Sequence, residues 1–203
     1  MTIREPRLST VAIDALRPTQ HAVGMREVRE KRRHWRSVDN PGEFLGSHLI
    51  PVIHGYKDRY YLIDNHHLAR ALHDEGVADI AITVVADLRR LDKREFWTFL
   101  DNRGWLHPYD AEGRRRDWSE LPRRVAELED DPYRSLAGEL RRAGGFAKDT
   151  TPFSEFLWAD FLRRRIGRRR VESRFSAALA QALDLARSEA ASYLPGWCGP
   201  VAR

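Results

Sequence analysis

The chain has 203 residues, 42% of them hydrophobic, which is enough for one large domain or a small domain with a substantial extension. Lys and Arg (35) outnumber Asp and Glu (30), so the charge favours an anionic partner such as a nucleotide, a nucleic acid or a phosphorylated metabolite. A single cysteine, Cys198, excludes an intramolecular disulfide framework, and no segment has the roughly 20 apolar residues of a membrane span, which predicts a cytoplasmic protein with no membrane partner.

The first elements alternate between strand and helix patterns. Residues 9–16 are predicted to form a strand, and 23–38 have the charge pattern of a helix that ends before Asn40-Pro41-Gly42. Residues 48–55 and 59–64 are two apolar runs with a short polar gap between them. This arrangement is typical of a β-hairpin.

The hairpin is followed directly by a helix and a further strand. The helix is predicted over 66–76 and ends at a glycine, and the strand over 80–88 is almost continuously apolar. The resulting order β-α-β-β-α-β predicts an α+β core with a small mixed sheet over residues 1–90.

Residues 91–203 are predicted to form a mainly helical extension packed on that core. Helices are expected over 92–105, 152–166 and 175–194. The second of these carries an apolar stripe of Phe153, Phe156, Leu157, Phe161 and Leu162, and we expect Phe156, Trp158 and Phe161 to be at least partly buried.

The end of the hairpin carries an unusual polar quartet: Asp64, Asn65, His66 and His67. A helix that begins directly after a strand presents unpaired N–H groups and the positive end of its dipole, which together suit a phosphate. Asp64 or Asn65 can cap this helix, and the two histidines can donate to phosphoryl oxygens or act as acid and base. The alternative is an ordinary capped helix with two surface histidines.

The segment "LIPVIHGYKDRYYLIDNHHLARALHDEGVADIAITVVADL" resembles the core of the ParB/sulfiredoxin superfamily. Its helix start is most similar to the Asp-Gly-His-His-Arg motif of the free-serine kinases. With the separated motifs "LRPTQHAVGMREV", "DDPYRSLAGELRRAGGF", "PFSEFLWADFLR" and "LPGW", nearly the whole chain resembles the ParB-like nuclease branch.

The resemblance implies that Asp64, His66 and His67 are catalytic and lie at nucleotide phosphates. Asn65 stands where glycine is usual, and Leu68 stands where the kinases and sulfiredoxin have an arginine. His66 takes the place of the sulfiredoxin cysteine, so repair of sulfinic acid is excluded for want of the nucleophile. No helix-turn-helix is evident after the core, which argues against a ParB-type segregation clamp.

Other positions are predicted to bind the nucleotide or its phosphates, besides Asn65. In the serine kinases a glutamate thought to be the base corresponds to Gln20, and an amide cannot act as a base. Gln20 and the adjacent Thr19 are therefore predicted as binders, with a simple turn as the alternative. The remaining predicted binders are Arg70, Arg134 and Ser135. Arg134 could replace the arginine lost at Leu68, or could lie in an internal salt bridge.

The function predicted from these observations is a ParB-like nucleotide-binding enzyme. It would transfer a phosphoryl group from a nucleoside di- or triphosphate to a small hydroxylated metabolite, or hydrolyse the nucleotide, with Mg²⁺ as a companion ion. The alternative is a nucleic-acid-binding protein or nuclease. The basic run at 163–174 is expected to be a solvated face, and the only paired carboxylates suited to two-metal cleavage are Asp130 and Asp131.

Overall fold

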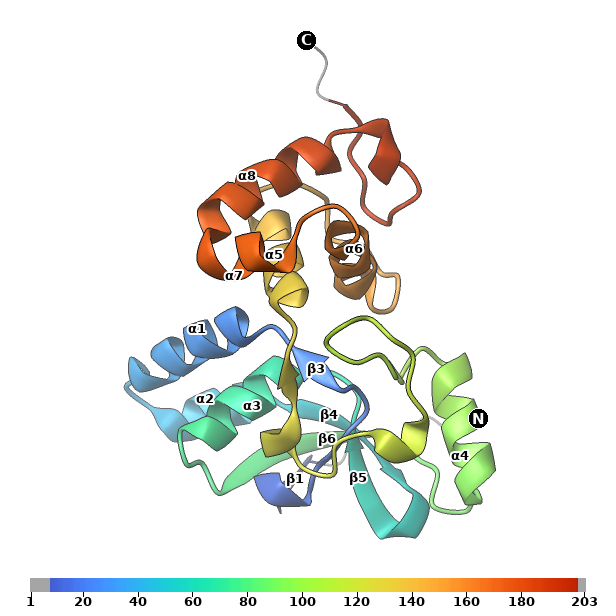
Figure 1. Cartoon of the computed structure of the whole chain (residues 1–203). Coiled ribbons are helices and arrows are strands. Elements are labelled where there is room, and N and C mark those ends of the chain that lie inside the picture. The colour runs from blue at the N-terminus through green and yellow to red at the C-terminus, as the bar shows by residue number, and fades with distance from the viewer. Residues whose placement is uncertain (1–7, 201–203) are drawn as a thin grey trace. The chain divides into compact units, whose positions relative to one another are not determined.

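The structure is a computed structural model that describes residues 8–200. It divides into two units (Figure 1). The first contains the described residues up to Ala22 together with Val28–Glu129, and the second contains Val23–Glu27 and the described residues from Asp130 onward. The units therefore divide after Glu129, beyond the boundary at residue 90 that the sequence suggests. The packing of the helical extension on the core stays a prediction.

The first unit is built around a five-stranded mixed sheet, which confirms the predicted α+β class. Its strand order is β1-β6-β4-β5-β2, and the strands are β1 (Leu8–Ala12), β6 (Asp79–Asp87), β4 (Ile50–Gly55), β5 (Arg59–Leu62) and β2 (Arg17–Pro18). β1 pairs with β6 and β4 with β5 in antiparallel fashion, whereas β6–β4 and β2–β5 are parallel pairs. The parallel β2–β5 pair places Arg17 opposite Tyr61 and Pro18 opposite Leu62.

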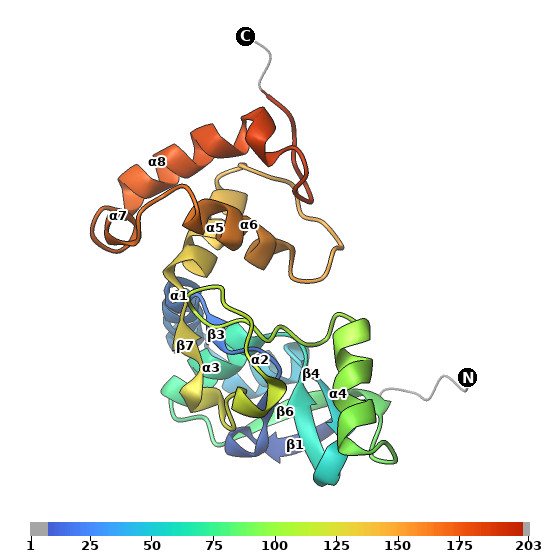
Figure 2. The same cartoon turned by 45° about the vertical axis from the view of Figure 1, so that its right-hand side comes forward.

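Four α-helices accompany this sheet: α1 (Met25–Arg36), α2 (Pro41–Ser47), α3 (His66–Asp74) and α4 (Lys93–Asn102). Figures 1 and 2 show α3 and α4 on opposite sides of β4. Phe96, Trp97 and Leu100 of α4 form a buried cluster with Ile53 and Tyr61 of the sheet. The hydrophobic effect of this burial holds α4 against β4 and β5.

Helix α1 ends before Asn40-Pro41-Gly42, as predicted, and the same residues begin α2, a helix that the sequence did not suggest. Asn40 caps this helix. Its Oδ1 accepts a hydrogen bond from the backbone N–H of Glu43 at 3.2 Å, and Pro41 is the first helical residue. Asparagine at the cap followed by proline starts a helix as effectively as it ends one.

The predicted hairpin is confirmed, and its tip is the short 3₁₀ turn η2 (Tyr56–Asp58). Lys57 and Asp58 both have left-handed backbone angles, with φ of 60° and 56°. The turn is tied to β4 by His54, whose Nε2 lies 2.7 Å from Oδ1 of Asp58. Three further 3₁₀ turns in this unit are η1 (Ile13–Ala15), η3 (Trp118–Glu120) and η4 (Val125–Glu127).

The second unit is helical. It contains α5 (Pro132–Arg142), α6 (Ser154–Arg163), α7 (Arg168–Ser173), α8 (Phe175–Ala186) and the turn η5 (Glu189–Ala191). Its core includes Trp158 and Phe161 at 0% and 1% exposure, while Phe156 is half-buried, as predicted. Leu157 was wrongly expected in the apolar stripe: it is 45% exposed.

Two short strands, β3 (Ala22–Val23) and β7 (Glu129–Asp130), pair where the chain passes between the units. The basic run 163–174 covers the end of α6 and all of α7, where Arg168 Nε donates to Glu172 at 2.7 Å. Among residues 8–200, no helix is both long enough and apolar enough to cross a membrane.

Candidate functional site

The junction between β5 and α3 adopts a turn that explains the asparagine at position 65. Asn65 precedes α3 with φ of 60°, in the left-handed region. Glycine and asparagine both tolerate this region, so Asn65 preserves the backbone shape where the kinase motif has glycine. Asp64 Oδ1 accepts the Asn65 backbone N–H at 2.6 Å. Asn65 makes no side-chain cap, contrary to one of the two expectations, because its amide donates to the Leu49 carbonyl at 3.3 Å.

His66 is buried and has a defined hydrogen-bonding role. Its Nε2 accepts the backbone N–H of Thr19 at 3.2 Å, and the Thr19 hydroxyl donates to the Leu62 carbonyl at 2.7 Å. Burial, followed by the proximity of His107, lowers the pKa of His66 to about 3. The imidazole is therefore neutral at neutral pH and joins β2 to α3, two segments far apart in the sequence.

The surroundings of this pair are unusually polar for a protein interior. Thr19, Gln20, His21, His66 and His67 are each less than 8% exposed. The burial of both His66 and His67 contradicts the alternative of two surface histidines.

Hydrogen bonds link several of these polar groups. His107 donates its backbone N–H to the Thr19 carbonyl at 2.9 Å, and the Gln20 amide donates to the Ala22 carbonyl at 2.8 Å. His21 is different, since its Nε2 is buried and lacks a hydrogen-bond partner, and burial lowers its pKa. Buried polar groups cost free energy unless they are paired, and such clusters mark functional sites more often than cores.

The predicted arginines are held by other groups. Arg70 donates from Nε to Asp74 at 2.9 Å and from its guanidinium to the Leu128 carbonyl. Arg134 belongs to the second unit, where it forms ion pairs with Glu155 and Glu27. This is the internal salt bridge that the sequence left as an alternative. Ser135, also in the second unit, accepts the Arg26 backbone N–H at 3.3 Å.

A companion metal would need ligands from the junction itself. The described residues bring together no group of three His, Cys, Asp or Glu side chains suited to a metal. Asp131 is 1% exposed and paired with Arg163 at 2.6 Å, and Asp130 accepts the Met25 backbone N–H at 2.9 Å. Mg²⁺ commonly binds through one or two carboxylates plus substrate phosphates, and at the junction the carboxylate available for this is the exposed Asp64.

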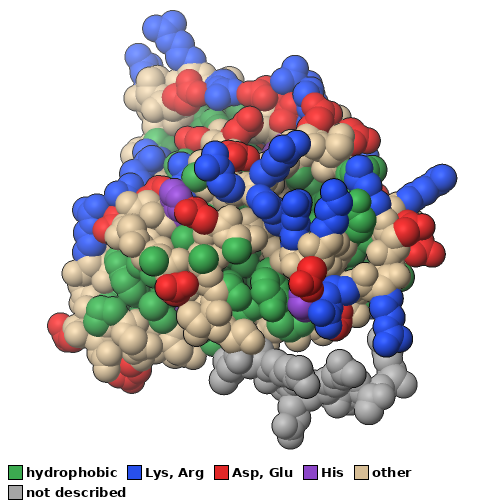
Figure 3. All heavy atoms as spheres, turned by 90° about the horizontal axis from the view of Figure 1, so that it is seen from below, with side chains coloured by type: hydrophobic (Ala, Val, Ile, Leu, Met, Phe, Trp, Pro, Cys, Tyr) green, Lys and Arg blue, Asp and Glu red, His purple; other side chains and the backbone are tan. Residues whose placement is uncertain are grey.

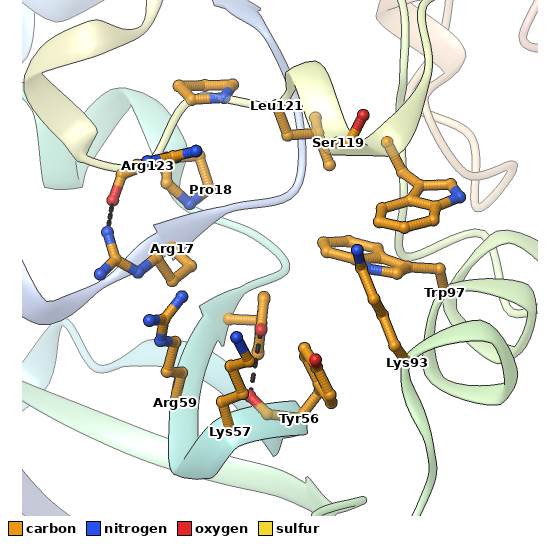
Figure 4. Close-up of a pocket in the computed structure, with 13 residues that line it drawn as sticks. Arg17, Pro18, Tyr56, Lys57, Arg59, Lys93, Trp97, Ser119, Leu121 and Arg123 are labelled. Atoms are coloured by element: carbon orange, nitrogen blue, oxygen red, sulfur yellow. Dashed lines mark hydrogen bonds between the residues drawn. The ribbon is translucent and has the colours of Figure 1, made fainter.

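A second feature of the first unit was not predicted from the sequence. It is a pocket of about 390 Å³ (Figure 4), which we call the basic-aromatic pocket. Its thirteen lining residues are Arg17, Pro18, Tyr56, Lys57, Arg59, Tyr61, Lys93, Trp97, Trp118, Ser119, Leu121, Pro122 and Arg123. Figure 3 shows Lys and Arg side chains gathering on the face seen from below. The cations come from separate segments, so only the pair Lys57 and Arg59 offered a local signal.

Comparison with known proteins identifies the family. The model of the family described as "Putative ParB-like nuclease" matches residues 9–164. The chain belongs to this ParB-like nuclease family. The match spans the first unit from β1 onward and continues through α5 and α6. No curated protein matches the chain.

A solved structure is similar to nearly the whole chain. The chain is similar to the crystal structure titled "Crystal structure of protein Atu1540 from Agrobacterium tumefaciens", with a TM-score of 0.92 and 55% sequence identity. The similarity covers 97% of this chain and 99% of that one. The family match confirms the ParB-like resemblance, while the serine-kinase detail of the motif stays a prediction.

Proposed function

We propose that this ParB-like protein binds the phosphates of a nucleoside di- or triphosphate at the amino end of α3 and transfers a phosphoryl group to a small hydroxylated acceptor. The observation that carries the proposal is the group of buried polar side chains around a helix start whose N-cap residue makes no side-chain cap. The N–H groups of the first helical turn and the helix dipole supply the anion site. The hydrogen bond from the Thr19 backbone N–H to His66 fixes the start of α3 to the segment after β2 and so holds the anion site in place.

The residues at the junction have separate tasks in this reaction. His66 is a positioning residue, since its lone pair holds the backbone of Thr19 and its low pKa keeps it uncharged. Gln20 orients the ligand, and His67 donates to phosphoryl oxygens. Asp64 is exposed and is the base that removes the acceptor's hydroxyl proton. The new phosphorus–oxygen bond forms as the bond to the nucleotide's bridging oxygen breaks. A bound Mg²⁺ would neutralise phosphate charge.

A single added charge tests the phosphate site. Asn65→Asp keeps a residue that tolerates left-handed angles and adds a negative charge directly before the helix start at which the phosphate would bind. We expect the affinity for ATP, ADP, CTP or GTP with Mg²⁺, whichever binds, to fall about tenfold or more in calorimetry. The matched control is Asn40→Asp at the cap of α2, which makes the same substitution at another helix start. Equal affinity in the two variants would refute the site.

Turnover is tested separately from binding. Asp64→Asn should retain nucleotide affinity measured without Mg²⁺ and lose nucleotide consumption that depends on a hydroxylated metabolite, because an amide cannot accept the proton. Unchanged turnover would remove Asp64 from the reaction.

The second candidate function is nucleic-acid binding or cleavage, as the family's description suggests. The basic face in Figure 3 and the sequence pI of about 9.6 favour it. Retention of DNA that weakens steeply with salt, without nucleotide consumption, would select this function over phosphoryl transfer.

A further inference from the structure

The basic-aromatic pocket has two chemically different ends. Figure 4 shows Arg17, Arg59 and Arg123 on one side, opposite Trp97 and Lys93. The arginines come from β2, from β5 and from the segment after η3, and all of the lining residues belong to the first unit. The pocket is thus formed by the sheet and loops of the first unit and needs no contribution from the second unit.

The arginine end concentrates positive charge, and its lining contains no carboxylate; Glu127, outside the lining, offsets this charge only in part. Five of the lining residues are Lys or Arg and none is Asp or Glu. The guanidinium of Arg17 donates to the backbone carbonyl of Arg123, and its Nε is buried with no hydrogen-bond partner. Burial and then the neighbouring Arg59 lower the pKa of Arg17. Like charges held together in this way are stabilised by a bound anion.

Arginines elsewhere on the first unit are arranged differently. Arg89 pairs with Asp87 at 2.8 Å, and Arg116 pairs with Glu120 at 2.5 Å. Because the chain readily pairs surface arginines with nearby acids, the absence of acids from the pocket lining is a local property. It leaves the charge of Arg59 and Arg123 available to a ligand.

The other end of the pocket is aromatic. Trp97 and Trp118 are stacked with ring centroids 5.6 Å apart, and Lys93 Nζ lies 4.4 Å from the Trp118 ring centroid. Tyr61 meets Trp97 edge to face at 5.5 Å, and Tyr56 also lines the space. Such a wall suits a planar ring, and the cations beside it exclude a purely apolar ligand.

We propose that the basic-aromatic pocket is a second binding site, separate from the α3 junction, for a nucleoside that carries a phosphomonoester or polyphosphate. The base would lie against Trp97, Trp118 and Tyr56, and the phosphates between Arg17, Arg59 and Arg123. The volume of about 390 Å³ lies near the lower end of small-ligand sites, roughly 300 to 1,000 Å³, and suits one nucleotide unit.

Charge decides which phosphate fits. An internal phosphodiester has one negative charge, whereas a phosphomonoester has about two and a polyphosphate more. Five cations around one nucleotide unit therefore match a terminal phosphate better than an internal one. Two sources share this chemistry: a free nucleotide and the phosphorylated end of a nucleic-acid strand.

Calorimetric titration of the full chain tests the site. The probes are AMP, ADP, ATP, a 5′-phosphorylated tetranucleotide and the same tetranucleotide without the phosphate. The pocket variant is Arg59→Gln/Arg123→Gln, because both side chains are exposed and neither makes a structural ion pair among the described residues. The matched control is Arg29→Gln/Arg33→Gln on α1, which removes the same charge from exposed positions outside the pocket.

We expect at least one phosphorylated probe to bind wild type and control alike, and to bind the pocket variant about tenfold or more weakly. Preference for free nucleotides or for the phosphorylated strand identifies the source. Equal affinity of every phosphorylated probe for the pocket variant and the control overturns the proposal, as does no binding of any probe.

The same titration separates this site from the one at α3. Loss of binding in Asn65→Asp but not in the pocket variant overturns the pocket and leaves the proposed function standing. Loss only in the pocket variant supports the pocket and refutes the α3 phosphate site. Two binding events, each lost in one variant, support both.

Discussion

Arginine has opposite environments in the helical unit and in the basic-aromatic pocket of the first unit. In the helical unit, Arg163 pairs with the buried Asp131 at 2.6 Å, and Arg134 lies between Glu155 and Glu27. In the basic-aromatic pocket, Arg17 and Arg59 have other cations as neighbours and no acid in the lining. The same side chain therefore holds helices together in the helical unit and stays available for a ligand in the pocket. Arginine content alone cannot distinguish these uses.

The largest expected effect comes from removing the carboxylate of the buried ion pair in the helical unit, which tests whether its arginines are structural. Asp131→Ala leaves Arg163 without its buried partner and removes the α5 cap, where Asp131 Oδ1 accepts the Tyr133 backbone N–H at 2.9 Å. We expect the free energy of unfolding to fall by about 3 to 5 kcal/mol in urea denaturation. Asp160→Ala is the control: Asp160 also contacts Arg163 but is 39% exposed, and its loss should cost about 1 kcal/mol or less. Equal losses would contradict a special role for the buried pair.

The buried His66 of the first unit should make the stability of the protein depend on pH. The pKa of His66 falls from 6.5 to about 3 on folding, so the unfolded chain binds a proton over this range that the folded chain does not. The contribution of His66 to the free energy of unfolding is therefore fully present above pH 6.5. It is lost as the pH falls towards 3, by up to about 1.4 kcal/mol per pH unit. His66→Gln keeps an acceptor for Thr19 and cannot titrate, so its stability should fall less steeply on acidification. Parallel slopes from thermal denaturation would contradict this, although burial lowers the pKa of His21 in both proteins.

The smallest expected effect is a slight increase in stability, opposite in sign to the two losses above. Arg59→Gln removes an exposed cation beside Arg17 without breaking an ion pair with an acid. We expect the ligand-free protein to keep its stability or gain up to about 0.5 kcal/mol, because like-charge repulsion decreases. Thermal denaturation in low salt, where screening is weakest, measures this. A loss above about 1 kcal/mol would place Arg59 among the structural arginines.

Local periodicity predicted much of the fold. The hairpin, the helix after it and the buried face of α6 follow from apolar spacing and from glycine at a helix end, which act within one segment. The sequence also identified the β5–α3 junction as polar. The hydrogen bonds within the junction could not be predicted from the sequence, because the bond between Thr19 and His66 depends on the parallel β2–β5 pairing.

What the sequence did not reveal depends on long-range contacts or on exposure. The pocket gathers cations from four separate parts of the chain, so no local pattern marks it. Leu157 fits the helical stripe, yet tertiary packing leaves it exposed. The pairing of Arg134 was one of two open alternatives, and only the positions of Glu27 and Glu155 decide between them.

At the hairpin tip, the residue that is best for stability differs from the residue that is best for ligand binding. Left-handed angles at Lys57 and Asp58 are unfavourable for residues with a Cβ, and glycine would adopt them without that cost. A library randomised at position 57 and selected only for heat resistance should therefore enrich glycine or asparagine. Selection for retention on an immobilised nucleotide should instead keep lysine, because Lys57 is one of the cations of the pocket.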